Sequence, residues 1–276
     1  QRRDAGAGPR VRGAGRLVVG WAAASVAAVG GGPAHTGYAP RHPSDVAARR
    51  PRTLEQNAET KAQLARIARQ REPWFRARGT VAAPGTGLVT LTGNVATPGV
   101  YEIDLGSALV DAVGRAGGVR SAPIGILIGG YFGTWLDPER GVSAALCPED
   151  VSRGCGVVCV LGTDGCGIGE SARIVGYMAR ESAGQCGPCV HGLRAVAEAM
   201  SRLASGDADR GDLSRIQRWS SQIVGRGACN HPDGAVHNLR TALATFAEDA
   251  ERHVRGRARL VLGTSPLPPP PRSPFG

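Results

Sequence analysis

Two cysteines three positions apart stand out among the residues that could do chemistry. Cys186 and Cys189 enclose a Gly-Pro pair in a Cys-x-x-Cys motif, and Cys229 follows forty residues after Cys189. Thiolates are soft, anionic ligands that select zinc or iron–sulfur clusters over calcium or magnesium. The spacing therefore favours a metal centre on Cys186, Cys189 and Cys229. A redox dithiol, or cysteines buried as small apolar side chains, would give the same motif and stays open.

Helical periodicity indicates how these cysteines meet. Between the apolar strand 156–161 and residue 256, four segments carry apolar residues close to the i, i+3, i+4, i+7 pattern of an amphipathic helix. These residues are Ile174, Val175 and Met178; Leu193, Val196, Met200 and Leu203; Leu213, Ile216, Trp219 and Ile223; and Val236, Leu239, Leu243 and Phe246. Short links favour an antiparallel four-helix bundle. The loops holding Cys186 and Cys229 would then lie at the same end.

A smaller α/β unit is expected before the helices. Residues 88–95 and 100–103 are apolar and β-branched, and Thr97-Pro98-Gly99 between them has turn chemistry, which predicts a hairpin. A short helix and a strand over 124–128 follow. Hairpin, helix and strand in this order open a β-grasp. The predicted fold class is α+β, a small β-grasp domain followed by an antiparallel four-helix bundle that carries the cysteine loop.

The rest of the chain divides by composition. A helix is expected from Thr53, as its cap, to Gln70, with Pro73 ending it. The predicted parts are a weakly ordered arm (1–50), a connecting helix (51–80), the β-grasp domain (81–145), the helical bundle with the cysteine loop (155–256) and a disordered Pro-rich tail (257–276).

Charge and cysteine count limit the location and the partners. The net charge is +10, but the basic residues are almost all arginines spread along the chain without an aromatic-interleaved stripe, so no nucleic-acid partner is expected. Seven cysteines cannot all pair, and 276 residues do not need disulfides in place of a core. We therefore expect a cytoplasmic protein. The apolar run 17–29 could be taken as a secretory signal, but it is too short to span a membrane.

The run from Glu181 to Cys189, Glu-Ser-Ala-Gly-Gln-Cys-Gly-Pro-Cys, resembles the cluster loop of a known family. This is the NADH-binding flavoprotein subunit of respiratory complex I, with its relatives in NAD-dependent hydrogenases and formate dehydrogenases. The family loop reads Glu-Ser-Cys-Gly-x-Cys-x-Pro-Cys, with a fourth cysteine about forty residues on. The segments 57–60, 74–75 and 91–102 also resemble the family's linking helix and its β-grasp (SLBB) hairpin. The resemblance implies a [4Fe–4S] cluster on Cys186, Cys189 and Cys229.

One ligand of the family pattern is missing here. The first family cysteine falls on Ala183, which leaves one iron open, and His191 and His231 are the nearest substitutes. Cys166 is expected to begin the first bundle helix, about 25 Å from Ala183 at about 1.5 Å per residue. Cys147, Cys155 and Cys159 are expected to be core or loop thiols. A structural zinc site on the three cysteines and His231 is the rival interpretation.

The resemblance also implies what this chain lacks. The family's FMN and NADH domain lies upstream, and no such unit is recognisable here, so we expect neither FMN nor NAD to bind and no NADH oxidation by this chain alone. The glycines at 162, 165, 167 and 169 do not fit a dinucleotide-binding register. The expected function is electron relay between a flavin on another domain or chain and a ferredoxin-like carrier. A metal-free scaffold or ligand module, with Gly129-Gly130-Tyr131 facing the ligand, is the third hypothesis.

Overall fold

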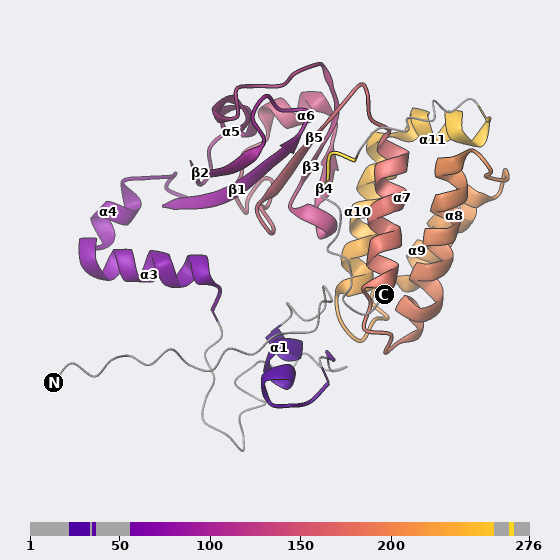
Figure 1. The fold of residues 1–276 in the computed structure, drawn as a ribbon, viewed down its shortest axis with the longest axis horizontal. Helices are drawn as coiled ribbons and strands as arrows, with labels where there is room; N and C mark the ends of the chain where they lie inside the picture. The colour runs from indigo at the N-terminus through magenta and orange to yellow at the C-terminus, as the bar shows by residue number, and fades with distance from the viewer. Residues whose placement is uncertain (1–21, 34, 37–55, 257–264, 268–276) are drawn as a thin grey trace.

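The computed structural model describes residues 22–33, 35–36, 56–256 and 265–267 (Figure 1). Most of the predicted arm and tail lies outside these residues. Inside them, the arm contains a helix, α1 (Ala22–Val29), which was not predicted from the sequence. The tail also makes contacts: Leu267 is buried, and the Thr92 hydroxyl donates to the Pro266 carbonyl over 2.8 Å. The expectation of a disordered tail is therefore wrong at residues 265–267.

The connecting helix begins later than predicted. Helix α3 (Ala58–Gln70) starts after Asn57, whose side chain accepts a hydrogen bond from the Thr60 amide at 2.7 Å. Thr53, the predicted cap, lies outside the described residues. Helix α3 ends at Gln70, as predicted, and Arg71, with a φ of 73°, separates it from the short helix α4 (Glu72–Arg76). Pro73 lies in the first turn of α4, where amides lack helical partners.

A five-stranded mixed sheet forms one half of the molecule, in the order β2-β1-β5-β3-β4. Its strands are β1 (Thr86–Gly93), β2 (Gly99–Asp104), β3 (Pro123–Ile128), β4 (Thr134–Leu136) and β5 (Val157–Gly162). The pair β1–β5 is parallel and the other neighbours are antiparallel. The predicted hairpin is the β1–β2 pair.

Strand β5 was expected on the helical side of the domain boundary, but it is the central strand of the sheet. Its residues Val158, Cys159, Val160 and Leu161 are all buried, which requires cover on both faces of the strand. Such cover is found in the middle of a sheet that is packed on two sides. The helices α5 (Leu109–Arg115) and α6 (Pro138–Ser143) lie beside the sheet, and the short helix η3 (Gly130–Phe132) joins β3 to β4.

The second half of the molecule is helical (Figure 1). Its elements are α7 (Gly167–Arg180), the π-helical turn η4 (Pro188–Leu193), α8 (Arg194–Ser205), α9 (Asp212–Ile223), α10 (His231–Thr245) and α11 (Ala247–Val254). Helix α7 packs on α8 and α10, and α9 packs on α8 and η4. The α+β class is confirmed. The helical half contains more helical elements than predicted, because η4 precedes α8 and α11 follows α10. The four-helix arrangement stays a prediction.

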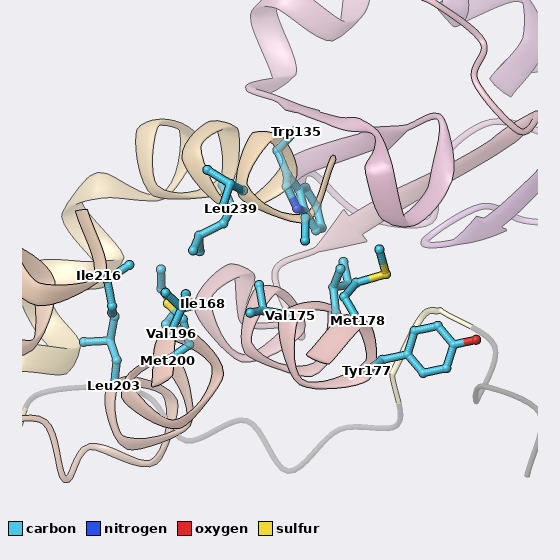
Figure 2. Close-up of a cluster of buried hydrophobic side chains, with 14 of the residues drawn as sticks. Trp135, Ile168, Val175, Tyr177, Met178, Val196, Met200, Leu203, Ile216 and Leu239 are labelled. Atoms are coloured by element: carbon cyan, nitrogen blue, oxygen red, sulfur yellow. The ribbon is translucent and has the colours of Figure 1, made fainter. Parts of the chain in front are cut away.

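Successive side chains of a strand point to opposite faces of the sheet, so the buried residues form two hydrophobic clusters. Leu127, Cys159 and Leu161 face the helices, and their neighbours Val158 and Val160 face the other side with Leu109 and Leu146. On the helical side, Trp135 of β4 lies among residues of α7 and α10 (Figure 2), and its ring meets Phe246 edge-on at 5.1 Å. The sheet and the helical half therefore share one continuous core. None of the described helices is both long and apolar enough to cross a bilayer.

Candidate metal centre

The three predicted cysteine ligands lie on segments that pack together. Cys186 is half-buried in the loop after α7, Cys189 is buried in η4, and Cys229 is half-buried two residues before α10 begins. The turn η4 contacts α7, α9 and α10. The loops before α8 and before α10 are thus brought together, as expected from the sequence.

The electrostatics of Cys189 show that the three thiols are neighbours. Burial, which has the largest effect, the nearby Cys186 and Cys229 thiols and a hydrogen bond to Cys186 together raise the pKa of the Cys189 thiol to about 12. Three thiols that would each carry negative charge oppose one another's ionisation. A bound cation or a cationic iron–sulfur core removes that opposition, because it compensates the thiolate charges.

The spacing of these donors bears on the kind of metal. Among the described residues, no three histidine, cysteine, aspartate or glutamate side chains are arranged to hold one ion. A mononuclear zinc site needs four donors at about 2.0–2.3 Å from a single point. A [4Fe–4S] cluster instead takes its cysteines on separate irons, so its ligands stand further apart. The two kinds of site therefore differ in how far apart their cysteine sulfurs lie.

The backbone at Cys186 is organised by the π-helical turn. The Cys189 and Val190 amides both donate to the Cys186 carbonyl, at 3.2 and 3.0 Å. Helical backbone starts at Pro188, two residues after Cys186. The amino-terminal end of this segment carries partial positive charge beside the cysteines, which favours an anionic group there.

His231 is fully buried at the first position of α10. Its Nε2 lies 2.8 Å from the Met178 carbonyl, and its ring meets Phe132 edge-on at 5.6 Å. Burial lowers the pKa of His231, although the Met178 carbonyl and nearby Glu181, which begins the cysteine loop, act in the opposite direction. Its Nδ1 is buried and has no hydrogen-bond partner among the described residues. His191, the other candidate, is exposed on η4.

The remaining cysteines lie elsewhere. Cys166 caps the opposite end of α7, where its sulfur accepts from the Gly169 amide and lies 3.2 Å from Nε2 of His253. Cys159 is a core residue of β5, and burial raises its pKa to about 12. Cys155 is exposed and its sulfur contacts the Gly129 carbonyl at 3.2 Å. Cys147 is half-buried after α6. This agrees with their expected roles as core and loop thiols.

The glycine-rich segments have packing explanations. A Cβ on Gly167 would lie 2.4 Å from the Phe246 ring, so the start of α7 needs a glycine to approach α10 closely. Gly129 and Gly130 have φ values of 95° and 79°, which favour glycine. Tyr131 packs on Tyr177, with ring centroids 4.9 Å apart. The Gly129–Tyr131 turn therefore satisfies backbone geometry and side-chain packing.

Two features of the site were not predicted from the sequence. The backbone amide and hydroxyl of buried Thr36 both lie within hydrogen-bond distance of Gln185 Oε1, at 3.2 and 3.1 Å, so the amino-terminal segment contacts the cysteine loop. A separate cleft of about 310 Å³ opens between α3, α4 and the β1–β2 hairpin. It is lined by Gln63, Arg66, Trp74, Phe75, Ala77, Arg78, Gly85, Thr86 and Glu102. No periodic pattern in the sequence indicates the Thr36–Gln185 contact or the cleft.

Comparison with known families agrees with this architecture. Residues 170–253 match the model of the NADH-ubiquinone oxidoreductase-F iron–sulfur binding region, and residues 88–123 match the SLBB domain. The first range includes all three proposed cysteine ligands, and the second covers β2, α5 and most of β1. The fold and the cysteine loop thus define an SLBB domain joined to an iron–sulfur binding helical region, and the match supports a [4Fe–4S] cluster as the cofactor.

The similar whole proteins are components of redox enzymes. The chain is 28% identical to the second F-type subunit of the NADH-quinone oxidoreductase of Rhizobium meliloti, over 89% of this chain and 60% of that protein. It is 26% identical to the HndC subunit of the NADP-reducing hydrogenase of Solidesulfovibrio fructosivorans, over 73% of this chain and 43% of that subunit. A crystal structure of an NAD⁺-reducing [NiFe]-hydrogenase in the air-oxidised state superposes with a TM-score of 0.77 at 28% identity, covering 87% of this chain and 42% of that one.

The chain is therefore a homologue of the F-type subunits of NADH-quinone oxidoreductases and of the related hydrogenase subunits. It spans about 60% or less of the length of these relatives.

Proposed function

We propose that this chain is the iron–sulfur electron-transfer module of an NADH dehydrogenase-type oxidoreductase. Cys186, Cys189 and Cys229 would hold a [4Fe–4S] cluster, which supplies one-electron redox chemistry when bound. The observation that carries the proposal is the mutual proximity of these three thiols, expressed in the raised pKa of Cys189, inside the iron–sulfur binding region. The sequence distance of forty residues between them is closed by the packing of η4 on α10.

The protein's own contribution is position and electrostatics. Cys189 is buried and Cys186 and Cys229 are half-buried, so the three thiols are partly shielded from water. The amino-terminal end of η4 favours extra negative charge, which stabilises the reduced state. The Thr36–Gln185 hydrogen bonds hold the loop that carries Cys186.

The relatives' names support a redox partner, because these proteins are subunits of an NADH-quinone oxidoreductase and of an NADP-reducing hydrogenase. In this proposal a flavin on another domain or chain delivers electrons, and a ferredoxin-like carrier receives them. The predicted domain division and the cytoplasmic location belong to the same proposal. NADH oxidation by this chain alone is not expected, because no FMN or NADH site is recognised in its sequence.

Anaerobic purification with iron, acid-labile sulfide and zinc analysis tests the proposal. We expect iron and sulfide in near-equal amounts, broad visible absorption, and an electron paramagnetic resonance signal after reduction with dithionite. Cys186→Ser is expected to lose iron. Cys155→Ser, at an exposed cysteine on the sheet side, is the matched control and should keep it. Zinc without iron, or equal iron in both variants, would contradict the proposal.

A ligand-binding module is the second candidate, because of the cleft beside α3. The Arg66 guanidinium lies 4.6 Å over the Trp74 ring, so the cleft joins an aromatic surface to a cation. Such a surface suits a planar anionic ligand. This function does not require the cysteines, and it would survive the loss of iron in Cys186→Ser.

A further inference from the structure

We propose that His231 binds, through Nδ1, the iron that three cysteines leave open. This inference rests on the proposed cluster and names its fourth ligand. Ala183 stands where the similar loop has its first cysteine, and a methyl side chain offers no donor atom. A four-iron cluster on three thiolates needs a donor from elsewhere, or it holds its fourth iron weakly.

The hydrogen bond to Met178 fixes which nitrogen of His231 is available. A backbone carbonyl can only accept, so Nε2 carries the proton and donates over 2.8 Å. In the neutral ring the lone pair is then on Nδ1. Histidines that bind metals commonly donate their second ring N–H to a carbonyl or carboxylate, which fixes the tautomer and the ring orientation. The Met178 carbonyl, in the last turn of α7, has that role here.

The free nitrogen is otherwise unexplained. His231 is 0% exposed, and its Nδ1 has no hydrogen-bond partner in the described part of the chain. Leaving a buried acceptor without a hydrogen bond is unfavourable, so such atoms in native proteins usually mark a missing water, ion or ligand. His231 is two residues after Cys229, and Glu181 at the start of the cysteine loop is close enough to influence it electrostatically. The orphaned atom thus belongs to a residue that joins the Cys229 segment to α7, the helix that leads into the cysteine loop.

Two other side chains, His191 and Asp233, are alternative candidates for the fourth ligand. His191 is exposed, and its ring needs no partner from the protein because water can solvate it. Asp233 lies near Cys189, but its Oδ1 already accepts the Gly225 amide at 2.9 Å. Of the three, only His231 combines full burial, a fixed tautomer and an unused donor atom.

A histidine in place of a cysteine has a redox consequence. Imidazole is neutral whereas thiolate is anionic, so the cluster with His231 carries one negative charge fewer. Histidine for cysteine substitution raises the reduction potential in other iron–sulfur centres. Ala183→Cys should therefore lower the midpoint potential of the cluster if the new thiolate displaces His231.

The test is spectroscopic and uses the whole chain, purified anaerobically with its cluster. With ¹⁵N-labelled histidine, pulsed electron paramagnetic resonance of the reduced protein should show a strongly coupled nitrogen whose frequency shifts with the isotope. His231→Ala should lose that coupling and contain about three irons per cluster in place of four. His191→Ala and Asp233→Asn should keep both properties.

The double variant Ala183→Cys/His231→Ala distinguishes the loss of a ligand from misfolding. If His231→Ala only removes a ligand, the new thiolate should restore four irons per cluster without nitrogen coupling. A wild-type cluster without histidine nitrogen coupling would overturn the assignment while leaving the electron-transfer proposal intact. Loss of coupling in His191→Ala but not in His231→Ala would also overturn it. A wild-type protein with no cluster would instead refute the proposed function.

Discussion

Replacing Asp212 with asparagine would separate the stability of the helical half from the chemistry of its cysteine loop. Asp212 opens α9 and is fully buried. Its Oδ1 accepts from Arg202 at 2.7 Å and from Arg215 at 2.6 Å, and its Oδ2 accepts from Arg202 at 3.0 Å. Arg202 lies in the last turn of α8, so this carboxylate ties the end of one helix to the start of the next.

The magnitude follows from the pKa of Asp212. The Arg202 hydrogen bond is the largest influence that lowers it, from 3.8 to about 2, against the opposing effect of burial. At about 1.36 kcal/mol per pH unit, this difference corresponds to roughly 2 kcal/mol of unfolding free energy. The contribution is complete above the unfolded pKa of 3.8 and declines as the pH falls toward 2. Asp212→Asn should therefore cost about 2 kcal/mol at pH 7 and much less near pH 2.

Urea unfolding followed by circular dichroism, at pH 7 and at decreasing pH, measures this difference. Asp209→Asn is the control, because Asp209 is exposed and forms its ion pair with Arg215, so a much smaller change is expected. Iron content at pH 7 should be equal in both variants, since Asp212 holds the α8–α9 turn and not the cysteine loop. A loss in Asp212→Asn that does not diminish below pH 4 would refute the electrostatic reasoning.

Three further predictions concern the loop and the core. Ala183→Cys should keep four irons per cluster and slow the loss of iron to a chelator; an unchanged rate of loss would show that residue 183 does not face the metal. Thr36→Val removes one hydrogen bond to Gln185, worth about 1 kcal/mol, and should speed iron release to a chelator roughly fivefold, whereas equal rates would exclude a role for this contact. Gly167→Ala should destabilise the fold by about 1–3 kcal/mol, because its Cβ would meet the Phe246 ring, and Phe246→Leu in the same chain should recover part of that loss in thermal unfolding.

The fold explains why such core changes should reach the cysteine loop. Phe246 packs on Trp135 of β4 and on the start of α7, so sheet and helices share one apolar cluster. Helices α7 and α10, which are continuous with the two cysteine segments, both rest on this cluster. A shift of either helix would move Cys186 relative to Cys229, because each cysteine is only a few residues from the helix end.

Local chemistry in the sequence was sufficient to propose the cysteine set and to predict most elements. Cys186, Cys189 and Cys229 are recognised by spacing, and apolar periodicity locates the helices that hold them, because both signals are encoded over a few residues. The helix caps were less predictable, as Asn57 in place of Thr53 illustrates, since several polar residues near a boundary can cap equally well.

Tertiary structure alone decided the contacts between distant segments. Strand β5 follows the β-grasp hairpin by about fifty residues, and its apolar sequence fits a central strand or a separate element equally well; only pairing with β1 and β3 selects the first. The Thr36–Gln185 contact and the orphaned Nδ1 of His231 depend likewise on residues far apart in sequence. Residue type specifies what a side chain can do, whereas packing determines which of its atoms remain free to do it.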